Sequence, residues 1–421
     1  MMEGWKKVRL NEFVWFQRGF DLPKSKFKEG NIPVFGSTSI LGYHNEAKVK
    51  APGIITGRSG TLGVMQFTHE DFWPHNTTLW VKDFKGNDER FAYYLLQCLD
   101  FNLFNSGGAV PTLNRNVLNS FVIDLPPLKT QRKIASILSA YDDLIENNLK
   151  RIKLLEEQAQ LTYEEWFVRF KFPGYETVKF DEETGLPEGW EKGKLSKLIN
   201  FQSGFAYKSA KFKERGYPVI KIRNIENNTI DISNTNFIDE EYASQTNKFK
   251  LNNGDLLIAM TGATVGKVGI VPITTTPCYL NQRVGRFVKK GEVDNTALVN
   301  CFFNVGGGLN HVLNIAGGAA QPNISAKQIL SIECVIPQQL ILKKFSEMAI
   351  NSSKVILNLQ NQNQHLKEAR DMLLPRLMSG MIDPSASSGQ VVEKLEVGSL
   401  KYKVNDSLGM VAEDIEKYKG A

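Results

Sequence analysis

The sequence predicts an α+β fold, in which two pseudo-symmetric mixed α/β domains are joined by two long antiparallel helices that form a coiled-coil spacer. The first observation is a heptad pattern of mostly apolar residues over positions 134–166, which recurs over positions 345–377. The second is a repeat of the segment before each heptad pattern, beginning at Gly4-Trp5 and again at Gly189-Trp190. Because a sustained heptad helix needs a partner helix, the second copy is the natural partner of the first.

The two heptad seams correspond residue by residue at a constant offset of 211 positions. The first seam consists of Ile134, Leu138, Tyr141, Ile145, Asn148, Ile152, Leu155, Ala159, Thr162 and Trp166, and the second of Phe345, Ala349, Ser352, Ile356, Leu359, Asn363, Leu366, Arg370, Leu373 and Leu377. A buried asparagine fixes the register of some coiled coils. Asn148 and Asn363 fit that role, but a position facing a solvent gap fits the pattern equally well, so both interpretations stay open.

The globular repeat holds without gaps at an offset of 185 positions near the start of each segment. There, Phe16-Gln17 matches Phe201-Gln202, Gly19-Phe20 matches Gly204-Phe205, and Pro33-Val34 matches Pro218-Val219. Later matches need small insertions and include Thr56-Gly57 with Thr261-Gly262, Gly60 and Gly63 with Gly266 and Gly269, Asn76-Thr77 near Asn281-Gln282, Pro111 with Pro322, and Pro126 with Pro337. The repeat therefore indicates a duplicated scaffold whose loops have diverged.

Local signals place the boundaries of these parts. We expect a first domain at 1–125, a first long helix at 126–170, a linker at 171–187, a second domain at 188–336, a second long helix at 337–380 and a partly flexible tail at 381–421. Short β-branched or aromatic runs predict strands at 32–35, 53–56, 78–81, 121–125, 219–222, 255–260, 284–288 and 332–336, and helices are predicted at 90–98 and 296–303. Pro126 and Pro337 suit the entries of the long helices, because Pro is tolerated in a first helical turn.

The composition limits the classes of function. A formal net charge of +6 over 421 residues permits a polyanionic partner, although an ordinary basic protein has the same balance. Cys98, Cys278, Cys301 and Cys334 are far apart, so we expect a reducing compartment and neither a disulfide framework nor a zinc site. The N-terminus lacks an apolar signal core, and no apolar run is long enough for a membrane span. A soluble, cytoplasmic protein is the expected result.

No catalytic motif is convincing. The run from Gly262 to Val268 resembles a phosphate loop, but it is one residue short and has Val268 where a magnesium-binding Ser or Thr is needed. The histidines are scattered without a metal-binding spacing. Asp124 is separated from Pro126-Pro127 by Leu125, unlike the amino-methyltransferase motif, and no methyl-donor motif is present. We therefore expect no catalytic residues, no metal site and no cofactor on this chain.

Several longer motifs lie on or beside the predicted helices. They are Gln131-Arg132-Lys133-Ile134-Ala135, Glu164-Glu165-Trp166-Phe167, Phe172-Pro173-Gly174 and Leu374-Pro375-Arg376-Leu377-Met378-Ser379-Gly380. With the two Gly-Trp starts, they make residues 1 to about 380 resemble the specificity subunit of type I restriction–modification systems. The tail beyond Ser385 departs from the common pattern of that family, as does Val268.

The resemblance implies a function. Each globular segment would be a target-recognition domain that reads one half of a bipartite, asymmetric DNA site. The two helices would form the spacer and dock two methyltransferase subunits, and restriction–translocase subunits would join them. The subunit itself would be non-catalytic, with S-adenosylmethionine, ATP and magnesium on the partner subunits only. At about 1.5 Å per residue, a helix over positions 134–166 spans roughly 50 Å, or about 14 base pairs.

DNA contacts are expected on loops that carry hydrogen-bond donors. In the first domain the candidates are Arg58, Ser59, Thr61, His75, Asn76, Thr77 and Arg115, and in the second they are Arg223, Asn224, Thr264, Lys267, Asn281, Gln282 and Arg283. Each could instead be a solvated turn residue. An alternative function is a non-catalytic helical adaptor whose two domains bind a ligand other than DNA. Salt-dependent binding to random duplex DNA distinguishes the two functions.

Overall fold

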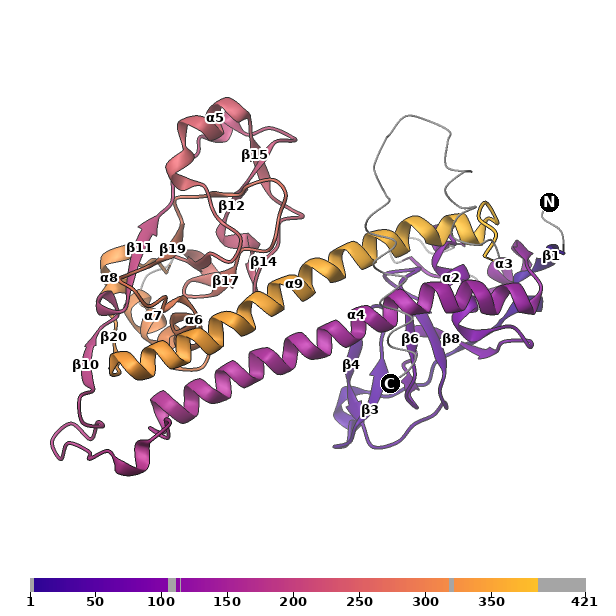
Figure 1. The fold of residues 1–421 in the computed structure, drawn as a ribbon. Helices are drawn as coiled ribbons and strands as arrows, with labels where there is room; N and C mark the ends of the chain where they lie inside the picture. The colour runs from indigo at the N-terminus through magenta and orange to yellow at the C-terminus, as the bar shows by residue number, and fades with distance from the viewer. Residues whose placement is uncertain (1–3, 105–110, 114, 318–321, 385–421) are drawn as a thin grey trace. The chain divides into compact units, whose positions relative to one another are not determined.

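The structure is a computed structural model that describes residues 4–104, 111–113, 115–317 and 322–384 (Figure 1). The chain divides into two compact units, one formed by residues 1–140 with 369–421 and the other by residues 141–368. Each unit contains one globular domain and parts of both long helices. The predicted tail lies outside the described residues from position 385 onward.

The described residues of the first unit form three small sheets. One has the strand order β2 (Trp15–Arg18), β8 (Thr78–Asp83), β5 (Gly53–Gly57), β6 (Met65–Thr68); another has the order β4 (Ile40–His44), β3 (Ile32–Phe35), β7 (Trp73–Pro74); and β1 (Lys6–Arg9) pairs with β9 (Val122–Leu125). The helices of this domain are α1 (Leu10–Phe13), α2 (Glu89–Gln97) and α3 (Arg115–Ser120). Every residue of β5 is buried, so this strand lies at the centre of the domain.

The second unit repeats this plan. Its main sheet has the order β11 (Ile199–Ser203), β19 (Val284–Lys289), β16 (Leu256–Ala259), β17 (Val268–Ile270), β14 (Asn228–Ile230), β13 (Ile225–Glu226); a second has β15 (Asn236–Ile238), β12 (Tyr217–Ile220), β18 (Tyr279–Leu280); and β10 (Glu191–Lys194) pairs with β20 (Glu333–Ile336). The helices are α5 (Glu240–Gln245), α6 (Thr296–Asn304), α7 (Gly308–Ala316) and α8 (Ala326–Leu330).

The topology confirms the internal repeat. The order β2-β8-β5-β6 in the first domain corresponds to β11-β19-β16-β17 in the second, and in each domain a middle strand pairs with one antiparallel and one parallel neighbour. The expected strands are present within two residues at each end, and the largest shift is that of the strand expected at 219–222, which is β12 (Tyr217–Ile220). The second domain differs by an insertion between β12 and β15, the counterpart of β4, that contains β13 and β14.

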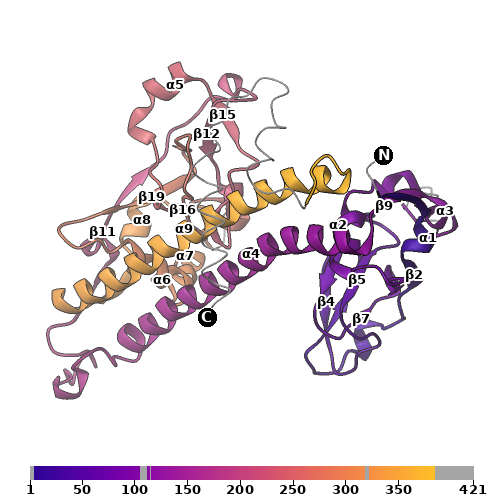
Figure 2. The ribbon, with the colours of Figure 1, turned by 45° about the vertical axis from the view of Figure 1, so that its right-hand side comes forward.

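The two long helices are α4 (Leu128–Tyr163), which continues into a π-helical turn (Glu164–Val168), and α9 (Gln339–Met378). Within the second unit they run antiparallel, side by side (Figure 2). Ile152, Ile356 and Leu359 form an apolar cluster between them. In the first unit, Ile134 and Leu138 share a buried core with Leu377. The seam residues predicted from the heptads thus face one another.

The polar layer of the seam is buried. Asn148 and Asn363 are 7% and 5% exposed, and Asn148 Nδ2 donates a 2.9 Å hydrogen bond to Asn363 Oδ1. This bond is formed only when these two turns lie opposite each other, so the pair favours one register over slipped alternatives. A position facing a solvent gap is thereby excluded.

Replacing Asn148 with Leu is expected to lower the free energy of unfolding by about 1–3 kcal/mol, because Asn363 keeps a buried amide without its partner. Replacing both residues with Leu is expected to recover most of that loss. Urea denaturation followed by circular dichroism measures both effects, and Leu149→Ala, at an exposed position on the same helix, is the control. A double variant as unstable as the single variant contradicts the pairing.

Each domain is anchored to the first turns of the long helix that follows it. Asn87 Nδ2 donates to the carbonyl of Phe13 at 2.9 Å, and its Oδ1 accepts from the buried amide of Gln131 on α4 at 2.8 Å. In the second domain, Asn295 Nδ2 donates to the carbonyl of Leu198 at 3.1 Å, and its Oδ1 accepts from Ser346 on α9 at 3.2 Å. Ser346 lies four residues beyond the position that matches Gln131, so the two helices make similar bonds from neighbouring turns. These bonds explain the glutamine of the Gln131-Arg132-Lys133 motif and define an asparagine anchor in each unit.

The aromatic motifs also have a structural explanation. Trp190 stacks on Phe172 with ring centroids 4.8 Å apart and contacts Phe167 on the π-helical turn. Phe167 in turn contacts Phe345 on α9 at 5.0 Å. Aromatic contacts of this kind add stability beyond the area they bury. In the described part of the chain, no helix combines the length and the apolar character needed to cross a membrane.

Candidate nucleic-acid interface

Backbone hydrogen bonds join three segments of the first domain. The N–H of Arg58 donates to the carbonyl of Thr77 at 2.9 Å, and the N–H of Leu113 donates to the carbonyl of Arg58 at 3.0 Å. The N–H of Gly60 donates to the carbonyl of Pro111 at 3.0 Å. These bonds hold together the glycine loop after β5, the loop after β7 and the segment 111–113. A DNA-binding surface formed by several segments requires such connections.

The candidate side chains of this surface differ in availability. Thr61 is exposed, while Arg58 and Ser59 are half-buried. The Nε of Arg58 is buried and has no hydrogen-bond partner among the described residues. Arg115 begins α3, and its side chain lies outside the described residues.

The remaining candidates of the first domain bond within the protein. His75 Nδ1 lies 3.0 Å from Thr77 Oγ1, and Asn76 Nδ2 donates to the carboxylate of Asp21. His75, Asn76 and Thr77 are all half-buried. These bonds use part of the hydrogen-bonding capacity of each side chain, so His75 and Asn76 also fix the loop.

Ser37 is a residue that sequence reasoning missed. It lies in the turn between β3 and β4, and its hydroxyl is 3.2 Å from the carbonyl oxygens of both Ser59 and Thr77. The hydroxyl can thus donate to either loop and tie them together. The repeat gave no signal for Ser37, because the second domain has Ile222 at the corresponding place.

The second domain uses the same hydrogen bonds. The N–H of Met260 donates to the carbonyl of Arg283 at 2.9 Å, and the N–H of Ile324 donates to the carbonyl of Met260 at 2.9 Å. The N–H of Gly262 donates to the carbonyl of Pro322 at 2.9 Å. The two domains therefore present equivalent loop clusters, built around Arg58 in one and Met260 in the other.

These bonds correct the register predicted for the glycine loops. Ser59 bridges to Thr112 as Thr261 bridges to Asn323, so Ser59-Gly60 corresponds to Thr261-Gly262. The match of Thr56-Gly57 with Thr261-Gly262 is wrong by three positions. The insertion after β12 changes the offset between the copies, and short Thr-Gly pairs carry too little information to locate the shift. Gly60 and Gly262 both have positive φ, +87° and +77°, which favours glycine.

The second cluster offers several available donors. Gln282, Arg283 and Lys267 are exposed. The hydroxyl of Thr264 is buried without a hydrogen-bond partner among the described residues, and Asn281 is 9% exposed. The N–H of His75 donates to Phe35 as the N–H of Asn281 donates to Ile220, so His75 and Asn281 are equivalent. The sequence predicted that Asn76 would match Asn281, which is one position away.

Arg223 and Asn224 have different environments. Arg223 is exposed, and its Nη2 donates to Asn236 Oδ1 at 3.2 Å. Asn224 is 2% exposed, and its Nδ2 donates to the carbonyls of Asp231 and Asn234, each at 3.0 Å. Asn224 therefore positions the surrounding turn, and its side chain is not accessible to DNA in this structure.

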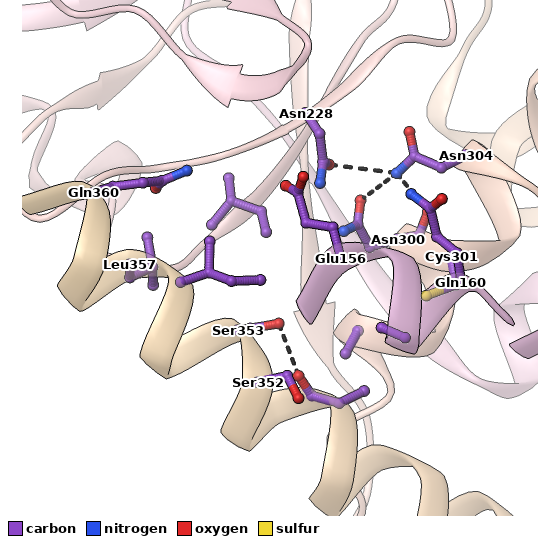
Figure 3. A pocket seen from close by; sticks show the side chains of 15 residues that line it. Glu156, Gln160, Asn228, Asn300, Cys301, Asn304, Ser352, Ser353, Leu357 and Gln360 are labelled. Atoms are coloured by element: carbon purple, nitrogen blue, oxygen red, sulfur yellow. Dashed lines mark hydrogen bonds between the residues drawn. The ribbon is translucent and has the colours of Figure 1, made fainter. Parts of the chain in front are cut away.

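A cavity of about 40 Å³ in the second unit does not resemble an active site (Figure 3). Its one carboxylate, Glu156, lies beside the amide of Asn228, while Asn304 Nδ2 donates to Asn228 Oδ1 and Asn300 Oδ1. Burial raises the pKa of Glu156, while a hydrogen bond from Asn228 lowers it. Burial raises the pKa of the Cys301 thiol to about 12, so the thiol is protonated and a poor nucleophile at neutral pH. No cluster of metal-ligating residues occurs among the described residues either.

A comparison of the sequence with known families agrees with the structural repeat, which comprises paired domains, anchored helices and repeated loop clusters. Residues 2–157 and 187–362 match the family model of the type I restriction modification DNA specificity domain. The chain belongs to this family. It therefore carries two specificity domains, one for each copy of the repeat.

Relatives in this family cover most of the chain. The type I restriction enzyme MjaVIII specificity subunit of Methanocaldococcus jannaschii is 27% identical over 305 residues, which are 70% of each chain. The HindI specificity subunit of Haemophilus influenzae is 22% identical over 65% of this chain and 72% of its own length. The type I S subunit from M. genitalium has the same fold, with a TM-score of 0.61, 16% identity and coverage of 89% of this chain and 96% of that one.

Proposed function

We propose that this specificity-family chain recognises a bipartite, asymmetric DNA site, with one half read by each domain. The observation that carries the proposal is the pair of loop clusters, which are held by the same backbone bonds but present different side chains. Met260 and Thr261 stand where Arg58 and Ser59 stand in the first domain. Because side-chain donors and acceptors at base edges determine sequence preference, two different clusters favour two different half-sites.

We assign the long helices the role of a spacer. With 36 residues, α4 is about 54 Å long at 1.5 Å per residue. The antiparallel seam and the buried Asn148–Asn363 bond give the pair a defined register. A fixed helix pair of this kind sets a fixed gap between half-sites, as dimer geometry does in other two-fold DNA readers.

The same helices are proposed to dock two methyltransferase subunits, which restriction–translocase subunits then join. Leu154 and Leu161 on α4 are 64% and 60% exposed and lie seven residues apart, on one face of the helix. Exposed apolar residues aligned in this way suit a protein interface. We place S-adenosylmethionine, ATP and magnesium on those cytoplasmic partners and assign no catalysis or cofactor to this chain.

The isolated chain is expected to bind duplex DNA with an affinity that falls as salt rises, and to show neither binding of the methyl donor nor methylation of DNA. The expectation of no methyl-donor binding rests on the sequence, which contains neither methyltransferase motif. The expected salt dependence follows from contacts between basic side chains and phosphates. Filter binding over a salt series and crosslinking of labelled S-adenosylmethionine test this expectation, with the methyltransferase complex as the positive control. Donor crosslinking to the isolated chain would contradict it. A lack of salt-dependent DNA binding, alone and in the complex, would favour the adaptor function.

A further inference from the structure

The turn after β12 brings two cationic side chains to one neutral acceptor. Lys221 precedes the 3-10 turn Ile222–Asn224, which contains Arg223. Lys221 Nζ donates to Asn236 Oδ1 at 2.7 Å, and Arg223 Nη2 donates to the same oxygen at 3.2 Å. The ammonium of Lys221 also lies 4.0 Å from the centroid of the Phe212 ring. Both cations therefore converge on one amide oxygen.

No carboxylate among the described residues pairs with either cation. Two other cations of the same unit do have carboxylate partners, since Arg286 pairs with Asp255 at 2.8 Å and Lys213 with Asp239 at 3.7 Å. Burial, and then the positive charge of Arg223, lower the pKa of Lys221. Two cations held together in this way favour an anion, which would relieve their repulsion.

The turn is held in place before any ligand binds. Asn224 Oδ1 accepts from the N–H of Lys221 at 2.9 Å, while Nδ2 donates to two carbonyls in the segment that leads to β15. Because Asn224 is buried, water does not compete for these bonds. The backbone that carries Lys221 and Arg223 is thus fixed, which lowers the entropic cost of binding.

The cations adjoin the candidate interface. A Cβ atom on Gly262 would lie 3.4 Å from Cδ1 of Ile222, so this turn packs against the glycine loop of the second domain. The N–H of His75 donates to the carbonyl of Phe35 at the end of β3, as the N–H of Asn281 donates to the carbonyl of Ile220 at the end of β12. The next residues, Gly36 and Lys221, are therefore equivalent. The first domain therefore has no cation at this position and instead uses Ser37 to join its loops.

We propose that Lys221 and Arg223 bind one phosphate of the DNA backbone beside the half-site read by the second domain. The inference rests on the proposed function and adds a contact that the first domain lacks. A phosphate has several acceptor oxygens and can receive both cations at once, while Asn236 holds the side chains in position. Contacts to phosphate fix the position of a protein on DNA without reading sequence. The pair should strengthen binding to all target sequences alike.

The test uses the full chain in complex with its methyltransferase subunits and a duplex that contains the methylation-mapped target. The double variant Lys221→Gln/Arg223→Gln is expected to weaken binding uniformly across sequences and to reduce the slope of log affinity against log salt by about one. Lys192→Gln/Lys194→Gln removes the same charge from the exposed positions of β10 and is the matched control. Lys221→Arg keeps the charge and is expected to bind nearly as well as the unaltered chain.

Neutral methylphosphonate linkages, introduced one at a time, locate the phosphate. One linkage beside the second half-site is expected to weaken binding of the unaltered complex and to have no further effect on the double glutamine variant. The inference is overturned if every linkage affects both proteins equally, or if the control variant loses as much affinity and salt slope. If the unaltered complex fails to bind the mapped duplex, the proposed function fails, and the phosphate site fails with it.

Discussion

Replacing residues 1–125 with the corresponding domain of another family member is expected to change one half of the DNA target completely and to leave the other half unchanged. The physical reason is that each loop cluster is closed by bonds within its own domain. Arg58 bonds through its backbone to both Thr77 and Leu113, and no residue of the second domain takes part in these bonds. Methylation mapping of the reconstituted complex on a random-sequence library measures both halves at once.

The design of this exchange depends on the anchor at Asn87. Asn87 lies inside the exchanged segment, whereas its partner Gln131 lies outside it. The donor domain should therefore carry an asparagine at the equivalent place, and a donor with that asparagine changed to Ala serves as the control for misfolding. If both halves of the target changed together in a folded chimaera, the two domains would not read DNA independently.

Inserting one heptad after Asn148 and another after Leu359 is expected to lengthen the gap between the half-sites by about three base pairs and to leave the half-sites themselves unchanged. Seven residues return the apolar face to the seam and add about 10 Å to each helix. The antiparallel pairing keeps Asn148 opposite Asn363 and Ile152 opposite Leu359 after both insertions. A target library with randomised gap length gives the readout.

A single-helix insertion and a non-heptad insertion are the controls for this experiment. A heptad in α4 alone leaves part of α4 without matching seam residues on α9, and an insertion of five residues in both helices rotates apolar residues out of the seam. Both changes are expected to destabilise the protein, which thermal unfolding would detect. If a folded and active double-heptad variant kept the original gap, some other element would set the spacing.

The long helices were predictable because their signal is periodic and local. Each seam repeats every seven residues, and the constant offset between the seams indicates which residues are equivalent. The contact of Ile152 with Leu359 and the bond between Asn148 and Asn363 follow from an antiparallel arrangement of those seams. Period therefore predicted the helices and their apolar contacts from the sequence alone, whereas the burial of Asn148 and Asn363 was left open by the sequence and is established by the structure.

The loop clusters were predicted only in part, because loops are fixed by bonds between distant segments. The candidates Arg58, Arg283 and Lys267 lie on the clusters, but burial could not be inferred from their sequence context, and Asn224 proved to be internal. Asn87 and Asn295 escaped notice because the offset between them differs from that of the flanking matches. Ser37 and Lys221 lie in equivalent turns of the two domains, but Ser37 corresponds to Ile222 and Lys221 to Gly36. Because the residue types differ, the repeat did not reveal either position.

The asparagine anchors also affect how genes of this kind can recombine. Asn87 and its partner Gln131 are encoded on either side of the boundary between the first domain and its helix, as are Asn295 and Ser346 in the second copy. A crossover between codons 87 and 131 separates a domain from its own anchor partner, whereas a crossover within the helix codons transfers the two together. Exchange of whole domains between alleles is therefore tolerated best when the joint falls inside the helix, after the anchor and at a whole number of heptads.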